Sequence, residues 1–226
     1  MKHAQEGMVT NQRSDRRTKL IVGAAATTLL ALVGAIVLLS PPQETGFSGS
    51  SSSARLAGKY SFQVGDPGPG QLAPPIRLMG TTGSEFDLAS FRGKTVLLYF
   101  QEGVTCQPCW DQARDIARHF QEFHALGIDQ VVTIATDPVD LMQRKAADAG
   151  LSMPVLSDPD LAVSRAYHAN DYGMMGQSRD GHSFVVVGPD GRIKWRADYG
   201  GAPAYTMYLP VENLVADMRQ GLRNAT

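Results

Sequence analysis

Two short apolar runs, each followed at once by a helical pattern, constrain the fold of this chain more than any other feature. Residues 96–100 read VLLYF and residues 131–135 read VVTIA, and runs of this length without polar alternation indicate strands buried on both faces. Apolar residues recur at helical spacing over 109–126 and again over 139–149. A strand–helix–strand–helix order requires parallel strands joined by right-handed crossovers. The sequence therefore predicts an α/β domain.

The C-terminal part of the chain adds an antiparallel element and a last helix. Residues 184–187 read FVVV and residues 192–195 read RIKW, and the GPDG sequence between them is typical of a tight turn. This pattern predicts a β-hairpin, and an amphipathic helix is expected over 211–222. An antiparallel hairpin beside parallel strands gives a central mixed sheet flanked by helices.

Residues 20–39 form an uncharged stretch of twenty residues, LIVGAAATTLLALVGAIVLL. At 1.5 Å per residue a helix of this length spans about 30 Å, which is the thickness of the hydrocarbon core of a bilayer. A cleavable signal peptide has a shorter apolar core, of about 7–15 residues. We therefore expect an uncleaved transmembrane signal anchor. A cleaved signal peptide and a twin-arginine signal at Arg16-Arg17 are the alternatives.

The charges and composition around this stretch predict the layout of the chain. Residues 1–19 carry five basic and two acidic side chains, and basic flanks of this kind stay in the cytoplasm. Residues 40–58 are rich in Ser, Gly and Pro and predict a flexible tether. Residues 59–226 then form one extracytoplasmic domain. The whole chain has a formal charge of −1, so it lacks the basic surface that nucleic-acid binding needs.

Both cysteines of the chain lie at the turn between the first predicted strand and its helix, in the sequence Cys106-Gln107-Pro108-Cys109. Free N–H groups and the macrodipole at a helix N-terminus favour the thiolate form of the first sulfur. Two intervening residues place the sulfurs about one helical turn apart, close enough to form and break a disulfide. A redox function is therefore the main expectation. A structural disulfide and a metal site are the alternatives.

Two histidines follow the cysteines in an order that resembles a zinc finger. On a continuous helix His119 lies ten residues beyond Cys109, which is about 15 Å at 1.5 Å per residue. One zinc ion holds all its ligand atoms within about 2.0–2.3 Å. These residues cannot share one ion, and we expect His119 and His124 to be solvated or half-buried positions on a helix.

The chain resembles the thioredoxin-like superfamily, and specifically its redoxin branch, which includes peroxiredoxins and membrane-anchored thiol-disulfide reductases. The resemblance covers about residues 62–220 and implies a thioredoxin-like fold. The C-x-P-C form is similar to the reductases of cytochrome maturation, in which the first cysteine attacks and the second resolves; Cys106 and Cys109 take those roles. The matching segments are Val64-Gly65-Asp66, Ala73-Pro74, Phe91-Arg92-Gly93-Lys94, Leu98-Tyr99-Phe100, Leu156-Ser157-Asp158-Pro159 and residues 184–191.

A peroxidase is the first alternative function. In peroxiredoxins a proline, a threonine and the peroxide-reactive cysteine follow the strand at fixed steps. Counted from Phe100, those steps fall on Glu102, Cys106 and Cys109. The resemblance to a thiol peroxidase therefore implies that Cys109 is the peroxide-reactive thiol.

A copper chaperone is the second alternative. The sequence Asp180-Gly181-His182-Ser183 before the hairpin is similar to the histidine segment of Sco-type copper chaperones, which bind copper with two thiolates and one imidazole. The ligands would be Cys106, Cys109 and His182.

The residues near the cysteines and His182 can also have supporting roles without taking part in the chemistry. His182 is then a loop histidine near the active face, and Met174-Met175 are hydrophobic cover for the disulfide. Asp111 and Glu102 are the nearest acids in sequence, and we expect them to be solvated surface residues. The alternative is that either acid accepts the proton of the resolving thiol.

The sequence is thus interpreted as a single-pass protein of the cell membrane with a cytoplasmic N-terminus. Its exported domain exchanges disulfides with a protein or a small thiol, and Cys106 attacks through a mixed disulfide that Cys109 resolves. An upstream thiol donates or accepts the electrons. No cofactor, metal or nucleic acid is expected.

Overall fold

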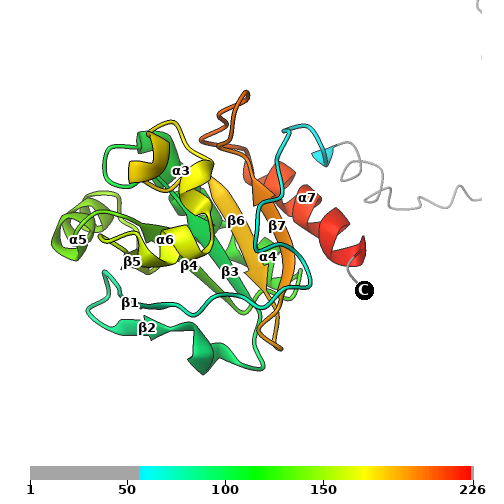
Figure 1. Cartoon of the computed structure of the whole chain (residues 1–226), viewed down its shortest axis with the longest axis horizontal. Coiled ribbons are helices and arrows are strands. Elements are labelled where there is room, and N and C mark those ends of the chain that lie inside the picture. The colour runs from blue at the N-terminus through cyan, green and yellow to red at the C-terminus, as the bar shows by residue number, and fades with distance from the viewer. Residues whose placement is uncertain (1–55, 225–226) are drawn as a thin grey trace, which may run out of the picture. The chain divides into compact units, whose positions relative to one another are not determined.

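The computed structural model describes residues 56–224, and a five-stranded sheet lies at its centre (Figure 1). The strand order is β5-β4-β3-β6-β7. β3 pairs in parallel with β4 and antiparallel with β6, which confirms the predicted mixed sheet of an α/β domain. The strands are β3 (Val96–Phe100), β4 (Gln130–Ala135), β5 (Val155–Ser157), β6 (Ser183–Val187) and β7 (Ile193–Asp198).

Helices cover both faces of this sheet. One face packs against α3 (Gln107–Arg118), α4 (Phe120–His124), α5 (Val139–Asp148) and α7 (Val211–Asn224). The other face packs against α6 (Ala162–Ala166) and the 3₁₀ helix η1 (Leu88–Phe91). A small hairpin of β1 (Arg77–Met79) and β2 (Glu85–Asp87) precedes η1, and the 3₁₀ helices η2 (Ala169–Asp171) and η3 (Gly176–Ser178) lie between α6 and β6.

Strand β3 is the most buried element of the sheet. All five of its residues have no exposed surface. Leu97 and Tyr99 face the α3 side, and Val96, Leu98 and Phe100 face the α6 side. Burial on both faces explains why the run has no polar alternation.

The helix predicted over 109–126 differs from the structure at its start and in its middle. α3 begins at Gln107, because the Cys106 sulfur accepts the Cys109 N–H and takes the N-cap position. The helix is interrupted at His119, whose backbone has φ −106° and ψ 22°. Phe123 beyond the interruption still packs into the core, so the apolar spacing alone does not reveal the break.

The domain begins slightly earlier than predicted. The carbonyl oxygen of Leu56 accepts a bond from Asn213 Nδ2 at 2.9 Å, and the Gly58 N–H donates to Asp217 Oδ1 at 2.6 Å. The last residues of the predicted tether are therefore attached to α7. The rest of the tether and the predicted anchor at 20–39 lie outside the described residues. Within 56–224, none of the helices combines the length and apolarity that a membrane span requires.

Candidate active site

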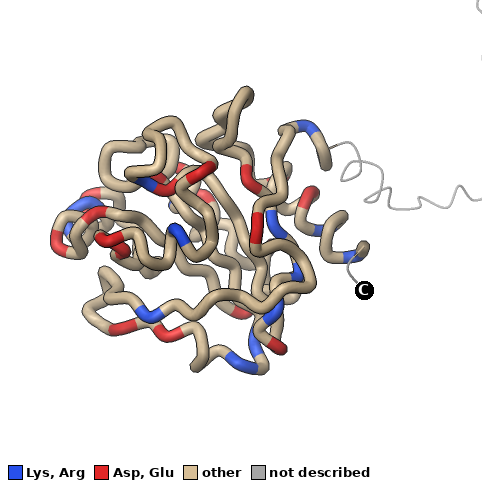
Figure 2. Tube along the Cα trace, viewed as in Figure 1, with Lys and Arg blue, Asp and Glu red and all other residues tan. Residues whose placement is uncertain are grey.

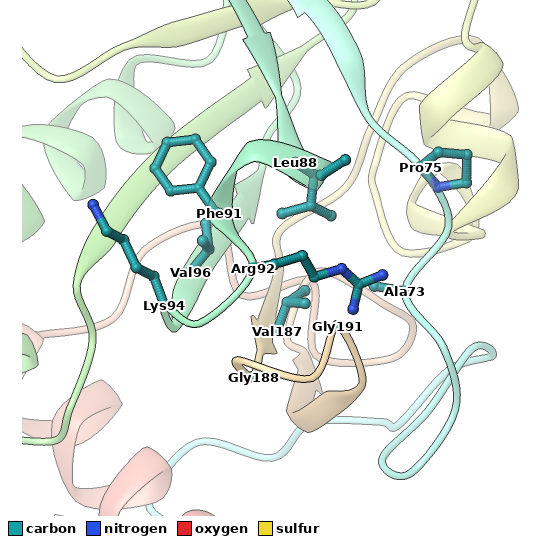
Figure 3. A pocket seen from close by; sticks show the side chains of 11 residues that line it. Ala73, Pro75, Leu88, Phe91, Arg92, Lys94, Val96, Val187, Gly188 and Gly191 are labelled. Carbon is teal, nitrogen blue, oxygen red and sulfur yellow. The ribbon is translucent and has the colours of Figure 1, made fainter.

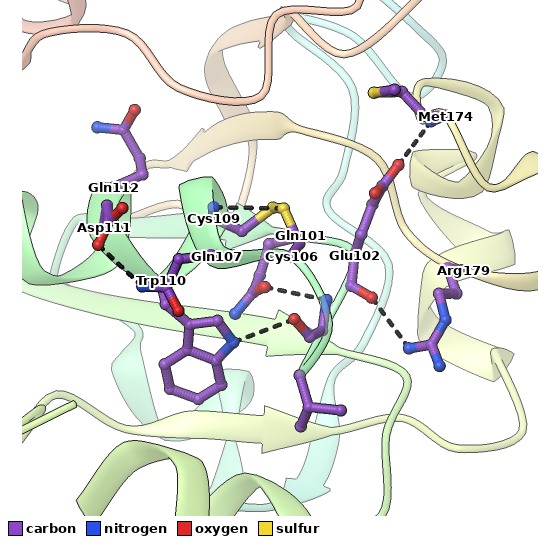
Figure 4. Close-up of a disulfide and its surroundings, with 12 residues drawn as sticks. Gln101, Glu102, Cys106, Gln107, Cys109, Trp110, Asp111, Gln112, Met174 and Arg179 are labelled. Atoms are coloured by element: carbon purple, nitrogen blue, oxygen red, sulfur yellow. Dashed lines mark hydrogen bonds between the residues drawn. A yellow bond between two sulfur atoms is a disulfide. The ribbon is translucent and has the colours of Figure 1, made fainter. Parts of the chain in front are cut away.

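Cys106 and Cys109 form a disulfide at the N-terminus of α3 (Figure 4). Their Cα atoms are 5.3 Å apart, and the Cys109 N–H donates to the Cys106 sulfur at 3.3 Å. Cys106 is 8% exposed, whereas Cys109 has no exposed surface. The structure thus brings together the two residues that the sequence predicts, and it makes them unequal. A reactant that arrives from solvent meets Cys106 first.

The loop between β3 and Cys106 is held by hydrogen bonds from both sides. The Gly103 N–H donates to Gln101 Oε1 at 3.0 Å, and the Gly103 carbonyl accepts Trp110 Nε1 at 3.0 Å. The Val104 N–H donates to Asp137 Oδ2 at 2.7 Å. Gly103 has φ +93°, a conformation that side chains disfavour. The loop therefore presents Cys106 in a fixed position.

Asp137 and Arg179 extend this support to the loop before β6. Arg179 Nη1 lies 2.9 Å from each carboxylate oxygen of Asp137. The same nitrogen donates to the Glu102 carbonyl at 3.0 Å (Figure 4). Asp137 is 5% exposed, so a charged partner is needed to offset the cost of burying its carboxylate. These contacts join three segments that are distant in the sequence.

Glu102 does not behave as a solvated surface acid. It is 6% exposed, and its Oε1 accepts the Met174 N–H at 2.5 Å. The prediction for Asp111 fits better, because this residue lies on the outer side of α3 and accepts bonds from Gln107 and Arg114. Met174 and Met175 are 61% and 53% exposed, and their role as hydrophobic cover for the disulfide stays a prediction. The Glu102 contact fixes the start of their loop.

His182 is the residue before β6, at the end of the sheet that leads to the disulfide, as expected of a loop histidine near the active face, but it is buried inside the protein. Its ring is fully buried, with ring centroids 5.2 Å from Tyr99, 5.1 Å from Phe184 and 6.3 Å from Tyr199. Burial lowers the pKa of His182 to about 3, so the imidazole is neutral. The described residues contain no group of three His, Cys, Asp or Glu side chains that could hold a metal ion. The geometry does not support the copper-binding alternative with Cys106, Cys109 and His182.

Tyr99 connects this buried histidine to the disulfide. Burial raises the pKa of Tyr99 well above its ordinary value, so the hydroxyl keeps its proton. That hydroxyl donates to the Cys109 carbonyl at 3.3 Å, and the ring stacks on Phe184 at 4.6 Å. Tyr99 thus supports the backbone of Cys109 from the β3 side.

A buried acid, Asp180, lies shortly before β6, at the end of the sheet that leads to the disulfide. Asp180 has no exposed surface, and its two carboxylate oxygens have no hydrogen-bond partner within 56–224. Burial raises the pKa of Asp180 well above its usual range. The neighbouring Ser164 hydroxyl donates to Asp158 Oδ2 at 2.6 Å. The protonated form of Asp180 is therefore favoured.

Sequence reasoning missed several of these supporting residues. Asp137 follows the second predicted strand, and the rule that parallel strands end at one edge of a sheet could have placed it near the cysteines. No sequence signal indicates Arg179, because its role depends on the path of the loop after η3. His119, which separates α3 from α4, and His124 of α4 are exposed, as expected.

The family follows from comparison with known proteins. Residues 69–196 match the AhpC/TSA family, and this range contains both cysteines, Asp137 and Arg179. The chain belongs to the AhpC/TSA family. It is therefore a thiol-dependent oxidoreductase, and the predicted resemblance to the redoxin branch is confirmed.

Relatives of this AhpC/TSA chain carry peroxiredoxin names. A protein of Mycobacterium tuberculosis named "Putative peroxiredoxin" is 35% identical over 130 residues, which cover 55% of this chain and 81% of the relative. Peroxiredoxin Bcp of Escherichia coli is 29% identical over 128 residues, with the same coverage of 55% and 81%.

Solved structures of peroxiredoxins share the fold of this AhpC/TSA domain. Peroxidoxin BcpB from Mycobacterium tuberculosis has a TM-score of 0.56 at 20% identity and covers 67% of this chain and 96% of that chain. A mutant of Xylella fastidiosa PrxQ has a TM-score of 0.54 at 18% identity and covers 73% and 97%. These similarities establish the thioredoxin-like α/β fold.

Proposed function

We propose that this protein is a thiol peroxidase that reduces a hydroperoxide and stores the oxidising equivalents as the Cys106–Cys109 disulfide. The disulfide at the start of α3, in a chain of the AhpC/TSA family, is the observation that carries the proposal. The peroxiredoxin names of the relatives support it further. A membrane-anchored disulfide reductase explains the cysteine pair equally well, but it does not explain these relatives.

Cys106 is the sulfur that attacks the peroxide in this proposal. It occupies the helix N-cap and receives the Cys109 N–H, and helix N-terminal N–H groups stabilise a thiolate. Cys109 is fully buried, and burial disfavours a charged sulfur. The count of residues after Phe100 places Cys109 at the family's reactive position, but the exposure of the two sulfurs favours the reverse assignment.

The reaction then proceeds in two balanced steps. The Cys106 thiolate attacks the outer peroxide oxygen, an S–O bond forms, the O–O bond breaks, and the alkoxide or hydroxide leaves as an alcohol or water after taking up a proton. Cys109 then attacks the sulfenic sulfur, the S–O bond breaks, and water leaves as the disulfide forms. Two electrons pass from the two thiols to the peroxide.

A thiol donor completes the cycle. A donor thiolate attacks the more exposed sulfur, Cys106, and Cys109 leaves; a second donor thiol then breaks the mixed disulfide. The donor supplies the two electrons and is itself oxidised to a disulfide. The sequence predicts an upstream thiol in this role.

Thiol–disulfide exchange with a protein substrate is the second candidate. Cys106 is partly exposed, whereas Cys109 is buried. Such exchange requires this asymmetry, because only one sulfur should form the mixed disulfide. In that function the peroxide steps are absent, and the first electron acceptor is a disulfide of another protein.

A single-turnover experiment separates the two functions. The fully reduced chain is mixed in a stopped-flow instrument with hydrogen peroxide or with an oxidised protein substrate, and Trp110 emission is followed because this residue adjoins Cys109. The proposal expects peroxide to be consumed one to one with disulfide formation, far faster than by free dithiothreitol. Peroxide oxidation no faster than that of dithiothreitol, with rapid protein disulfide exchange, would assign the second function. The Cys106→Ser/Cys109→Ser protein is the blank.

We also propose that the enzyme is a single-pass protein of the cell membrane, anchored by residues 20–39 with its N-terminus in the cytoplasm. The uncharged stretch and the basic residues before it support this orientation. The peroxidase domain then lies outside the cytoplasm, where its donor thiol must also be supplied.

A further inference from the structure

A cavity lies at the end of β3 that is remote from the disulfide (Figure 3). Its volume is about 210 Å³. Leu88 of η1, Val96 of β3 and Val187 of β6 form its apolar floor, and Ala73 lines its side. Val96 and Phe100 are four positions apart in the strand, or about 13 Å at 3.3 Å per residue. The cavity is therefore separate from the redox site.

Two cations border this apolar floor without an acidic partner. Arg92 Nη1 donates to the carbonyl oxygen of Asp190, and Lys94 Nζ lies 6.0 Å from the centre of the Phe91 ring. The Asp190 carboxylate pairs with Lys194 at 3.2 Å. Within the described part of the chain neither Arg92 nor Lys94 forms an ion pair.

Basic side chains gather around the cavity. Figure 2 shows several Lys and Arg positions, with an acidic position among them, at the end of the sheet where the β6–β7 turn lies. Arg92 and Lys94 stand in the loop before β3, beside that turn. An anion that approaches this end of the sheet therefore meets a favourable field.

We propose that this cavity binds a small organic carboxylate. Binding sites for small molecules combine apolar walls with a few charged groups that fix orientation. A guanidinium has five N–H donors in a fork that matches a carboxylate, and the structure uses one of its nitrogens for the Asp190 carbonyl. The carboxylate would meet Arg92 and Lys94, and its alkyl chain would lie over Leu88, Val96 and Val187.

The volume limits the size of this ligand. At about 30 Å³ for each water-sized unit, the cavity accepts roughly seven such units. That corresponds to roughly four to six carbon atoms with a carboxylate, as in butyrate or hexanoate. An acid of this length fills the cavity, so the ligand that we propose is a short-chain soluble acid.

Hexanoate binding to the full chain tests the proposal. The protein is held in nanodiscs of zwitterionic lipid, and binding is measured by saturation-transfer NMR with empty nanodiscs as the blank. Arg92→Gln/Lys94→Gln should weaken hexanoate binding at least tenfold. The matched control Lys59→Gln/Arg144→Gln removes two exposed cations elsewhere and should leave binding unchanged. Ala73→Leu, which narrows the cavity, should also weaken binding.

Competitor molecules separate the two parts of the site. Hexanol carries the chain without the charge, and inorganic phosphate carries charge without the chain; neither should displace hexanoate at equal concentration. Equal hexanoate affinity in wild type and in Arg92→Gln/Lys94→Gln would overturn the proposal. If phosphate displaced hexanoate as effectively as butyrate does, the proposal would be overturned as well, because the site would then recognise charge alone. Peroxide consumption should be unaffected by these substitutions, so either result is independent of the proposed peroxidase function.

Discussion

At the scale of single residues, the geometry of the active-site loop depends on Gly103. A Cβ atom at this position would lie 1.8 Å from Asp137 Oδ2, and φ is +93°. We expect Gly103→Ala to push Asp137 away from the Val104 N–H that it accepts. Unfolding in urea should show a loss of about 3 kcal/mol, from strain plus a broken buried bond. The rate of peroxide consumption should fall as well.

Gly127 provides the matched control. Its φ is +86°, but nothing lies within 4 Å of a Cβ built there. Gly127→Ala should therefore cost only the backbone strain, about 1 kcal/mol, and leave the peroxide rate unchanged. Equal losses of stability and unchanged rates in both variants would show that Asp137 does not fix the loop.

His182 gives the protein a predictable dependence on pH. Its pKa in the folded protein is lowered to about 3 by burial, below the unfolded value of 6.5. The unfolded chain thus binds the proton first, and the stability that neutral His182 provides at neutral pH is lost as the pH falls from 6.5 towards 3. The slope reaches about 1.4 kcal/mol per pH unit.

His182→Phe removes this titration while keeping an aromatic ring among Tyr99, Phe184 and Tyr199. The difference in unfolding free energy between variant and wild type should grow in favour of the variant as the solution is acidified below pH 6.5. Because Asp180 and other acids titrate in both proteins, they cancel in this difference. Parallel curves for the two proteins would contradict the buried neutral state of His182.

At the scale of elements, the sequence predicts best where burial alone decides the structure. The β3 and β4 runs and the β6–β7 hairpin lie at their predicted places. The predictions omit β5, with three residues, and α6, with five, because such short elements show no complete period. The residues of the candidate site likewise include some that the sequence predicts and some that it does not. The spacing of the two cysteines predicts the redox pair. The sequence does not predict the roles of Asp137 and Arg179, because these residues act through contacts between distant segments.

A buried ion pair within β7 binds the segment that precedes β1 through hydrogen bonds. Arg196 Nε lies 2.8 Å from Asp198 Oδ2, and both side chains have no exposed surface. Arg196 Nη1 also donates to the Pro67 carbonyl at 3.1 Å, and the Gly65 N–H donates to Asp198 at 2.8 Å. Arg196→Met would leave a buried carboxylate without its cation. We expect a loss of about 3–5 kcal/mol in urea unfolding.

Arg77 offers the comparison for this substitution. It pairs with Asp87 at 2.8 Å, but its side chain is 68% exposed. Arg77→Met should cost less than about 1 kcal/mol, as is typical of exposed pairs. Similar small losses for Arg77→Met and Arg196→Met would show that the β7 pair does not hold the segment at residues 63–67.

At the scale of the whole molecule, we propose that residues 20–39 anchor the enzyme with its domain outside the cytoplasm. A reporter enzyme that is active only outside the cytoplasm, joined after Thr226, should be active. The same fusion without residues 20–39 should remain in the cytoplasm and be inactive. Activity of the shortened fusion, or inactivity of the full one, would refute the proposed membrane topology.

The central claim is that Cys106 takes oxygen from the peroxide and Cys109 closes the disulfide. The direct measurement treats reduced Cys106→Ser and Cys109→Ser with hydrogen peroxide in the presence of dimedone, which traps sulfenic acid, and locates the adduct by mass spectrometry. Cys109→Ser should consume peroxide at the wild-type rate and carry the adduct on Cys106, while Cys106→Ser should react no faster than a free thiol. Rapid formation of the adduct on Cys109 would contradict this assignment, and slow reaction of both variants would contradict the peroxidase function.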